Sequence, residues 1–103
     1  MELNSIQYDA KKFTLEDGQT NYDVKANVAE LFDNIKVARR VVIKSDQTLT
    51  FRFNNVNLPT FEMVVSQNKN ESPFQMPENF MSIVNIFVTN ASGSTANIEI
   101  ILA

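Results

Sequence analysis

The sequence predicts an all-β protein: an antiparallel β-sandwich, jelly-roll-like, of about 7–8 short strands with one short α-helix near residues 27–34. Three observations support this prediction. Apolar and polar residues alternate with a period of two over most of the chain, as in strands with one buried face. Short polar segments separate the apolar runs. The regular alternation of strands and helices that a parallel sheet requires is missing from the sequence.

The first third of the chain is the least regular part. Two short strands are expected at residues 6–8 and 13–15, followed by a turn at Glu16-Asp17-Gly18. A third short strand is expected at residues 22–26. Residues 1–20 are interpreted as peripheral strands or as an arm that docks on a neighbouring molecule.

The one helical pattern follows directly. Apolar residues recur there at spacings of three and four: Val28, Leu31, Phe32 and Ile35. Asn27 and Glu30 have the spacing of a capping box, in which the first side chain caps a free N–H group and the second reaches back. These features predict a helix over residues 27–34.

The central segment predicts a hairpin. In "TLTFRFN" the apolar residues Leu49, Phe51 and Phe53 alternate with polar ones, and "RVVIK" lies just upstream. Strands at Val37–Lys44 and Thr48–Asn54 are therefore expected to pair across the short polar "SDQ". A further strand is expected at Phe61–Val65, followed by a long polar loop with a short strand near residues 73–76.

The last segment, "SIVNIFVTNASGSTANIEIILA", predicts a second hairpin across Ala91–Thr95. Asn90 and Gly93 are its predicted turn residues, and Gly93 is expected to adopt a positive φ. One face of the two strands is expected to form the core: Val84, Ile86, Val88, Ile98, Ile100 and Leu102. The other face carries Ile83, Phe87 and Ile101, which are therefore candidates for an interface with a partner or a second subunit. Cover by the short helix or a loop is the alternative.

Composition limits the possible functions. The 103 residues suffice for a single domain, 1–103, with one modest core. The net charge of −3 does not favour nucleic-acid binding, which needs a basic surface. No stretch approaches the ~20 apolar residues of a membrane span. The amino terminus shows no signal-peptide pattern, so synthesis in a cytoplasm is expected. The adjacent Lys11 and Lys12 are interpreted as charges on a strand edge.

Catalytic chemistry is also restricted. Without cysteine or histidine, the chain has no disulfide, no Cys/His zinc site, no Cys nucleophile and no histidine triad. Two glycines cannot form a phosphate-binding loop. Carboxylates such as Glu62 and Glu99 are isolated within strands. We therefore expect no enzyme activity, catalytic residue, metal, cofactor or small-molecule substrate. A hydrolase that uses only Asp and Glu is a remaining alternative.

Three segments carry a family resemblance: "RVVIKSDQTLTFRFNN", "SPFQM" and "VNIFVTNASGSTANIEIIL". Together they resemble small accessory virion proteins of tailed bacteriophages, which decorate the capsid or belong to the neck or tail. The resemblance spans Tyr22 to Leu102, and Asn85, Asn90, Gly93 and Asn97 match its closing motif.

This resemblance implies a non-enzymatic structural protein of the virion, made in the cytoplasm of a bacterial host. Its partners would be further copies of itself, as a homo-oligomer, and other virion proteins. A second hypothesis is a ligand- or carbohydrate-binding β-domain of a host-adhesion device. For that function, the expected aromatic residues are Tyr8 and Tyr22.

Overall fold

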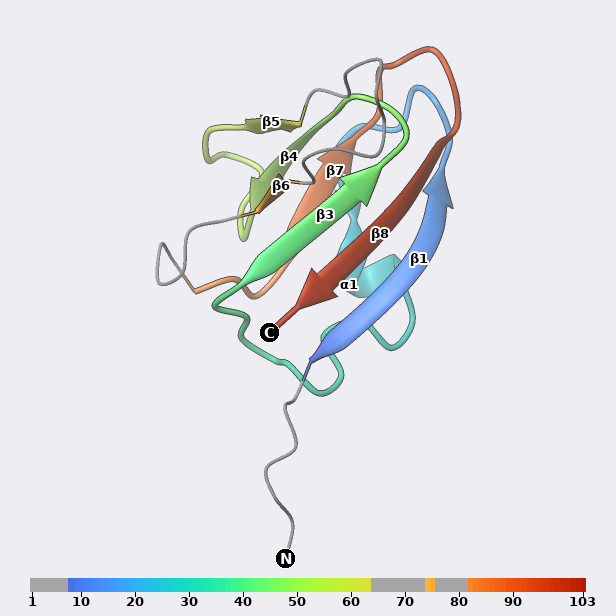
Figure 1. Ribbon diagram of the computed structural model, residues 1–103. Helices are drawn as coiled ribbons and strands as arrows, with labels where there is room; N and C mark the ends of the chain where they lie inside the picture. Colours follow the sequence, from blue (N-terminus) through green and yellow to red (C-terminus); the bar gives the residue numbers. More distant parts are fainter. Residues whose placement is uncertain (1–7, 64–73, 76–81) are drawn as a thin grey trace, which may run out of the picture.

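The computed structural model describes residues 8–63, 74–75 and 82–103 (Figure 1). These residues form two four-stranded antiparallel sheets and one short helix, which confirms the all-β prediction. The elements are, in chain order, β1 (Asp9–Leu15), β2 (Tyr22–Asp23), α1 (Val24–Asn27), β3 (Val41–Ser45), β4 (Leu49–Phe53), β5 (Phe61–Met63), β6 (Phe74–Gln75), β7 (Ile86–Thr89) and β8 (Ala96–Leu102). Within this part of the chain, no helix is long and apolar enough to cross a bilayer.

The first sheet, called sheet A here, has the strand order β1-β8-β3-β6, and sheet B has the order β2-β7-β4-β5. In Figure 1, β1, β8 and β3 lie side by side in front of the strands of sheet B. Only β4 and β5 are both consecutive in the chain and paired in one sheet. Every other step from one described strand to the next passes between the two sheets.

Both predicted hairpins are therefore wrong. β3 lies in sheet A and β4 in sheet B, so the segment that joins them crosses between the sheets. The same holds for β7 and β8, whose expected hairpin across residues 91–95 does not form. A short polar segment between two apolar strands looks the same in the sequence whether it turns within a sheet or passes between two sheets. Local pattern alone does not distinguish these cases.

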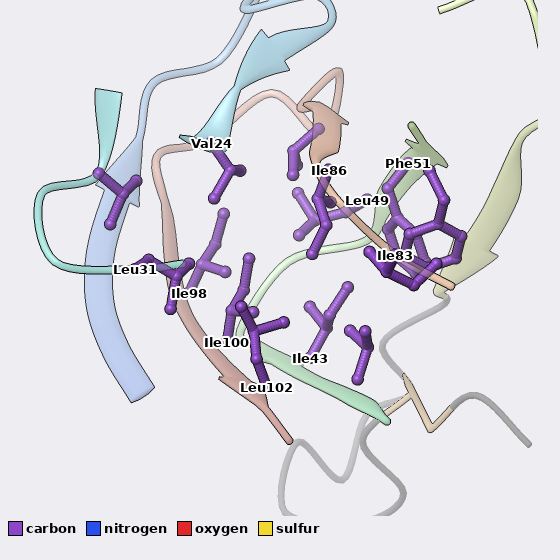
Figure 2. Packing of buried hydrophobic residues seen from close by; sticks show 14 of the residues in the cluster. Val24, Leu31, Ile43, Leu49, Phe51, Ile83, Ile86, Ile98, Ile100 and Leu102 are labelled. Carbon is purple, nitrogen blue, oxygen red and sulfur yellow. The ribbon is translucent and has the colours of Figure 1, made fainter. Parts of the chain in front are cut away.

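One hydrophobic core lies between the two sheets. Ile43, Ile98, Ile100 and Leu102 of sheet A face Leu49, Phe51 and Ile86 of sheet B (Figure 2). Phe51 and Phe53 pack with ring centroids 5.7 Å apart, and Phe53 also contacts Phe61. Burial of these side chains is the main favourable contribution to folding.

Five of the six predicted core residues of the closing strands are buried, but Val84 is 40% exposed. The cause is Asn54. Its side-chain oxygen accepts hydrogen bonds from the backbone N–H groups of Val84 (2.7 Å) and Asn85 (3.3 Å). The regular strand begins only at Ile86. Ile83 and Ile86 consequently both point into the core, which a continuous alternation does not allow.

The helix predicted over residues 27–34 is also wrong. The observed α1 is only four residues long, and Asp23 caps it by accepting a hydrogen bond from the N–H of Ala26 (3.1 Å). Glu30 and Phe32 have φ values of 70° and 69°, which a right-handed helix excludes. Residues 28–35 instead form an irregular loop whose apolar side chains still reach the core: Val28, Leu31, Phe32 and, in part, Ile35.

The ends of the other predicted strands are corrected in detail. One continuous strand, β1, replaces the separate strand expected at residues 13–15, and it pairs with β8 along its whole length. Residues 9–15 thus form an edge strand of sheet A. The turn at residues 16–18 is confirmed. The short strand expected near residues 73–76 is present as β6, while residues 1–7, 64–73 and 76–81 lie outside the described residues.

Candidate functional site

The three candidate interface residues do not lie together. Ile83 is fully buried, and its backbone exchanges two hydrogen bonds of 2.8 Å with Ala38. Its side chain is therefore covered by the chain itself and is not accessible to a partner. This corrects the expectation for Ile83, which came from assuming an unbroken alternation through residues 83–88.

Phe87 and Ile101 lie on opposite outer faces of the molecule. Phe87 is half-buried on the outer face of sheet B, where it is flanked in register by Asp23 of β2 and Arg52 of β4. Ile101 is half-buried on the outer face of sheet A, between Ala10 and Val42. Each of the two residues thus marks a separate candidate surface.

The outer face of sheet A also carries a row of charges. Lys12, Glu99 and Lys44 lie next to one another on β1, β8 and β3, and Lys44 Nζ is 3.7 Å from Glu99 Oε1. Glu99 lies on the face of Ile101, as its position in the alternation predicts. Lys11 and Lys12 lie on the edge strand β1, where the sequence placed them. Lys12 is exposed, whereas Lys11 forms an ion pair with Glu30.

Asn90 connects the β7–β8 loop to the end of β1. Its side chain is fully buried, donates to the carbonyl oxygens of Leu15 and Ser94 (both 2.9 Å) and accepts from the N–H and the hydroxyl of Ser92. Its backbone bonds to Gly18 and Gln19. Asn90 therefore uses all of its hydrogen-bonding capacity to join the two segments, and it is not the turn residue of a hairpin.

Gly93 has a φ of +93°, as predicted, although its loop passes between the sheets. Its N–H group donates to Asp17 Oδ1 at 2.9 Å, which adds a second link between this loop and the turn after β1. Apart from Gly93 and its two neighbours in the chain, no heavy atom lies within 4 Å of the position where a Cβ would be. The requirement for glycine here comes from the backbone conformation and not from crowding.

Substituting Gly93 is therefore expected to cost stability in proportion to the strain of the new residue at positive φ. We expect Gly93→Ala to lower the free energy of unfolding by about 1 kcal/mol. Gly93→Asn should cost less and Gly93→Val more, because asparagine tolerates positive φ best and β-branched residues worst. Urea denaturation of the three variants measures the order. Equal values for all three would contradict a backbone origin.

A polar surface depression lies where β1 begins, beside the loop of residues 30–34. Its volume is about 430 Å³, and its lining consists of Tyr8, Asp9, Ala10, Lys11, Glu30, Asp33 and Asn34. Tyr8 is 58% exposed. Tyr22, the other aromatic residue expected for a binding site, is half-buried and stacks on Phe13 with ring centroids 6.1 Å apart. Only Tyr8 is thus placed to contact a ligand in this depression.

Asp9 holds the loop that forms one side of the depression. Only 4% of Asp9 is exposed. Its carboxylate accepts hydrogen bonds from the backbone N–H groups of Asn34 (3.0 Å) and Ile35 (2.8 Å) and from Asn34 Nδ2 (2.9 Å). Burial alone raises the pKa of Asp9, but these hydrogen bonds and the charge of Lys36 outweigh it, so the pKa lies below its ordinary value.

Glu30 is fixed by an ion pair with Lys11, and the hydrogen bond and charge of Lys11 lower the pKa of Glu30. A glycosidase needs one carboxyl group with a raised pKa as its general acid. Asp9 and Glu30 both have lowered pKa values, and Asp9 is occupied by its hydrogen bonds. Neither of these two carboxyl groups therefore has the raised pKa that such a general acid needs.

No group of three or more residues suited to hold a metal ion is found among the residues that the structure describes. Sequence reasoning identified Tyr8 but missed Asp9, Glu30, Asp33 and Asn34. Asp9 and Asn34 are 25 positions apart, and no sequence pattern links them. The chain matches no family model, no curated protein and no solved structure.

Proposed function

We propose that this protein is a jelly-roll β-sandwich that serves as a non-enzymatic structural protein of a tailed-bacteriophage virion. It would provide subunit contacts on the capsid or in the neck or tail. The main support is the pattern of strand pairing. β4 pairs with β5, β3 with β6, β2 with β7 and β1 with β8. This is one long antiparallel ribbon with its turn between β4 and β5, wrapped so that its strands alternate between two sheets.

A jelly roll is this type of wrapped eight-stranded ribbon, and it is common in viral capsid proteins, lectins and cupins. The resemblance of residues 22–102 to phage virion proteins favours the first of the three classes. Because a fold alone does not define a function, the proposal rests on the strand pairing and the resemblance together.

Subunit contacts would involve the two outer sheet faces. On sheet A, the half-buried Ala10, Ile101 and Val42 form an apolar row beside the charged row of Lys12, Glu99 and Lys44. On sheet B, Phe87 lies between an acidic and a basic residue. Apolar side chains surrounded by charges are the usual arrangement of interfaces between subunits.

Introducing a charge at either position is expected to prevent assembly. We expect the wild-type protein to form a defined oligomer, and Phe87→Lys or Ile101→Lys to shift it toward monomer, because a buried unpaired ammonium is costly. Size-exclusion chromatography with light scattering measures the mass over a range of concentrations. Asn57→Lys, at an exposed position on the β4–β5 connection and away from both sheet faces, is the control for the added charge.

The outcome separates the two surfaces. Dissociation by only one of the two substitutions identifies the sheet that forms the contact. A wild-type protein that stays monomeric at all concentrations, and that is absent from purified phage particles analysed by mass spectrometry, would contradict the proposed function. Circular dichroism checks that each variant retains the fold.

A further inference from the structure

We propose that the depression at the start of β1 binds a neutral or amino-bearing saccharide. The depression is hollow enough for one sugar ring, since ligand sites typically have volumes of about 300–1,000 Å³, and this one measures about 430 Å³. Its lining residues come from the start of β1, which is the lower end of that strand in Figure 1, and from the loop that follows α1. This inference does not depend on the virion role proposed above.

The side of the depression is fixed before any ligand arrives. Three hydrogen bonds to the buried Asp9 carboxylate hold the backbone at Asn34 and Ile35. The Lys11–Glu30 ion pair ties the other end of the same loop to β1. A loop attached at two points loses little conformational freedom on binding, which favours affinity even for a small ligand.

The lining residues match the chemistry of a sugar. The exposed ring of Tyr8 offers a flat apolar surface to the C–H groups of a sugar ring, and its hydroxyl can donate or accept a hydrogen bond. Asp33 and Glu30 are exposed carboxylates, which accept hydrogen bonds from sugar hydroxyl or ammonium groups. Aromatic and carboxylate groups are thus brought together in one hollow.

The charge of the depression selects among saccharides. Its lining contains three carboxyl groups, Asp9, Glu30 and Asp33, and one ammonium group, Lys11. A phosphorylated, sulfated or sialylated sugar would be repelled, whereas a neutral or amino sugar would not. A basic peptide would also be attracted by the carboxylates. The exposed ring of Tyr8, which can pack against the C–H groups of a sugar, favours the sugar.

The test is an NMR titration of the ¹⁵N-labelled full chain with simple saccharides. The probes are the methyl glycosides of glucose and galactose, glucosamine, N-acetylglucosamine and the anionic N-acetylneuraminic acid. We expect one or more of the neutral and amino sugars to bind with millimolar affinity and to shift the amide signals of Ala10, Lys11, Asp33 and Asn34. N-acetylneuraminic acid is expected to cause no shift at these positions.

Two substitutions in the depression provide the second arm of the test. Tyr8→Ala and Asp33→Asn are each expected to weaken binding about tenfold, which corresponds to the loss of one favourable contact. Glu62→Gln, at an exposed carboxylate on sheet B, is the matched control and should leave the affinity unchanged. Unshifted signals away from the substituted residue confirm that each variant keeps the fold.

Three outcomes would overturn the proposal. The first is the absence of any shift with all saccharides at tens of millimolar. The second is a set of shifts that maps away from the depression or survives both substitutions. The third is a lysine-rich peptide that shifts the same signals when no saccharide does, which would reassign the depression to peptide binding.

Discussion

Replacing Asn90 with alanine is expected to lower the free energy of unfolding by about 3 kcal/mol. The substitution removes two donors and one acceptor from a fully buried position. The carbonyl oxygen of Leu15 then loses this partner at a buried position, whereas the Ser92 groups lie at an exposed residue and can bond to water. A buried polar group without a partner costs about 1–3 kcal/mol. Urea denaturation followed by circular dichroism measures the loss.

Asn57→Ala is the matched control because Asn57 is exposed on the β4–β5 connection. The free energy of unfolding of this variant should stay within about 0.5 kcal/mol of the wild-type value. Asn90→Asp separates hydrogen bonding from shape, since aspartate is similar in size but has no amide donor for the carbonyl oxygens. If Asn90→Ala were as stable as Asn57→Ala, the hydrogen bonds through which Asn90 joins the end of β1 to the β7–β8 loop would contribute little to the stability of the fold.

Replacing Asp9 with alanine is expected to cost about 2–3 kcal/mol at neutral pH, because two backbone N–H groups lose a charged acceptor. The effect should depend on pH. The pKa of Asp9 is lowered by folding from an ordinary value of 3.8, so the unfolded chain binds its proton more readily than the folded one. The stability that Asp9 supplies is complete above that value and is lost as the pH falls through the lower folded pKa.

The difference in the free energy of unfolding between wild type and Asp9→Ala should therefore be constant near neutral pH and become smaller below about pH 4. Asp9→Asn should retain part of the stability, since its side-chain oxygen can still accept the two backbone bonds. Because asparagine does not titrate, the part of the pH dependence of stability that comes from residue 9 should disappear in this variant. Asp33→Asn, an exposed carboxyl in the same loop, is the control for a general charge effect. A pH-independent difference for Asp9→Ala would contradict the assigned ionisation.

Alternation along the strands predicted most of the core, because burial on one face of a strand is a local property of the sequence. The prediction failed where a side chain interrupts the backbone pattern. At Val84, the alternation of inward and outward side chains is interrupted because the side chain of Asn54, 30 positions earlier, accepts a hydrogen bond from the backbone N–H of Val84. At residues 27–34, the apolar spacing was correct and the residues are buried, yet positive φ at Glu30 and Phe32 prevents a helix.

Pairing between strands was the least predictable feature. Local pattern favours neighbours in the chain, whereas the partners here are determined by packing over the whole domain. The same applies to the depression at β1. Tyr8 was identifiable as an aromatic residue near polar ones. Its grouping with Glu30 and Asp33 depends on the path of the loop after α1, which is fixed by Asp9.

The position of β8 has a consequence for how the protein folds. β8 lies between β1 and β3 in sheet A, although it is the last of the described strands to be synthesised. Sheet B contains β2, β7, β4 and β5 and does not need β8, but without β8 the strands β1 and β3 have no strand between them. Their apolar faces stay exposed until β8 is inserted, so folding is expected to be cooperative and vulnerable to aggregation before that step.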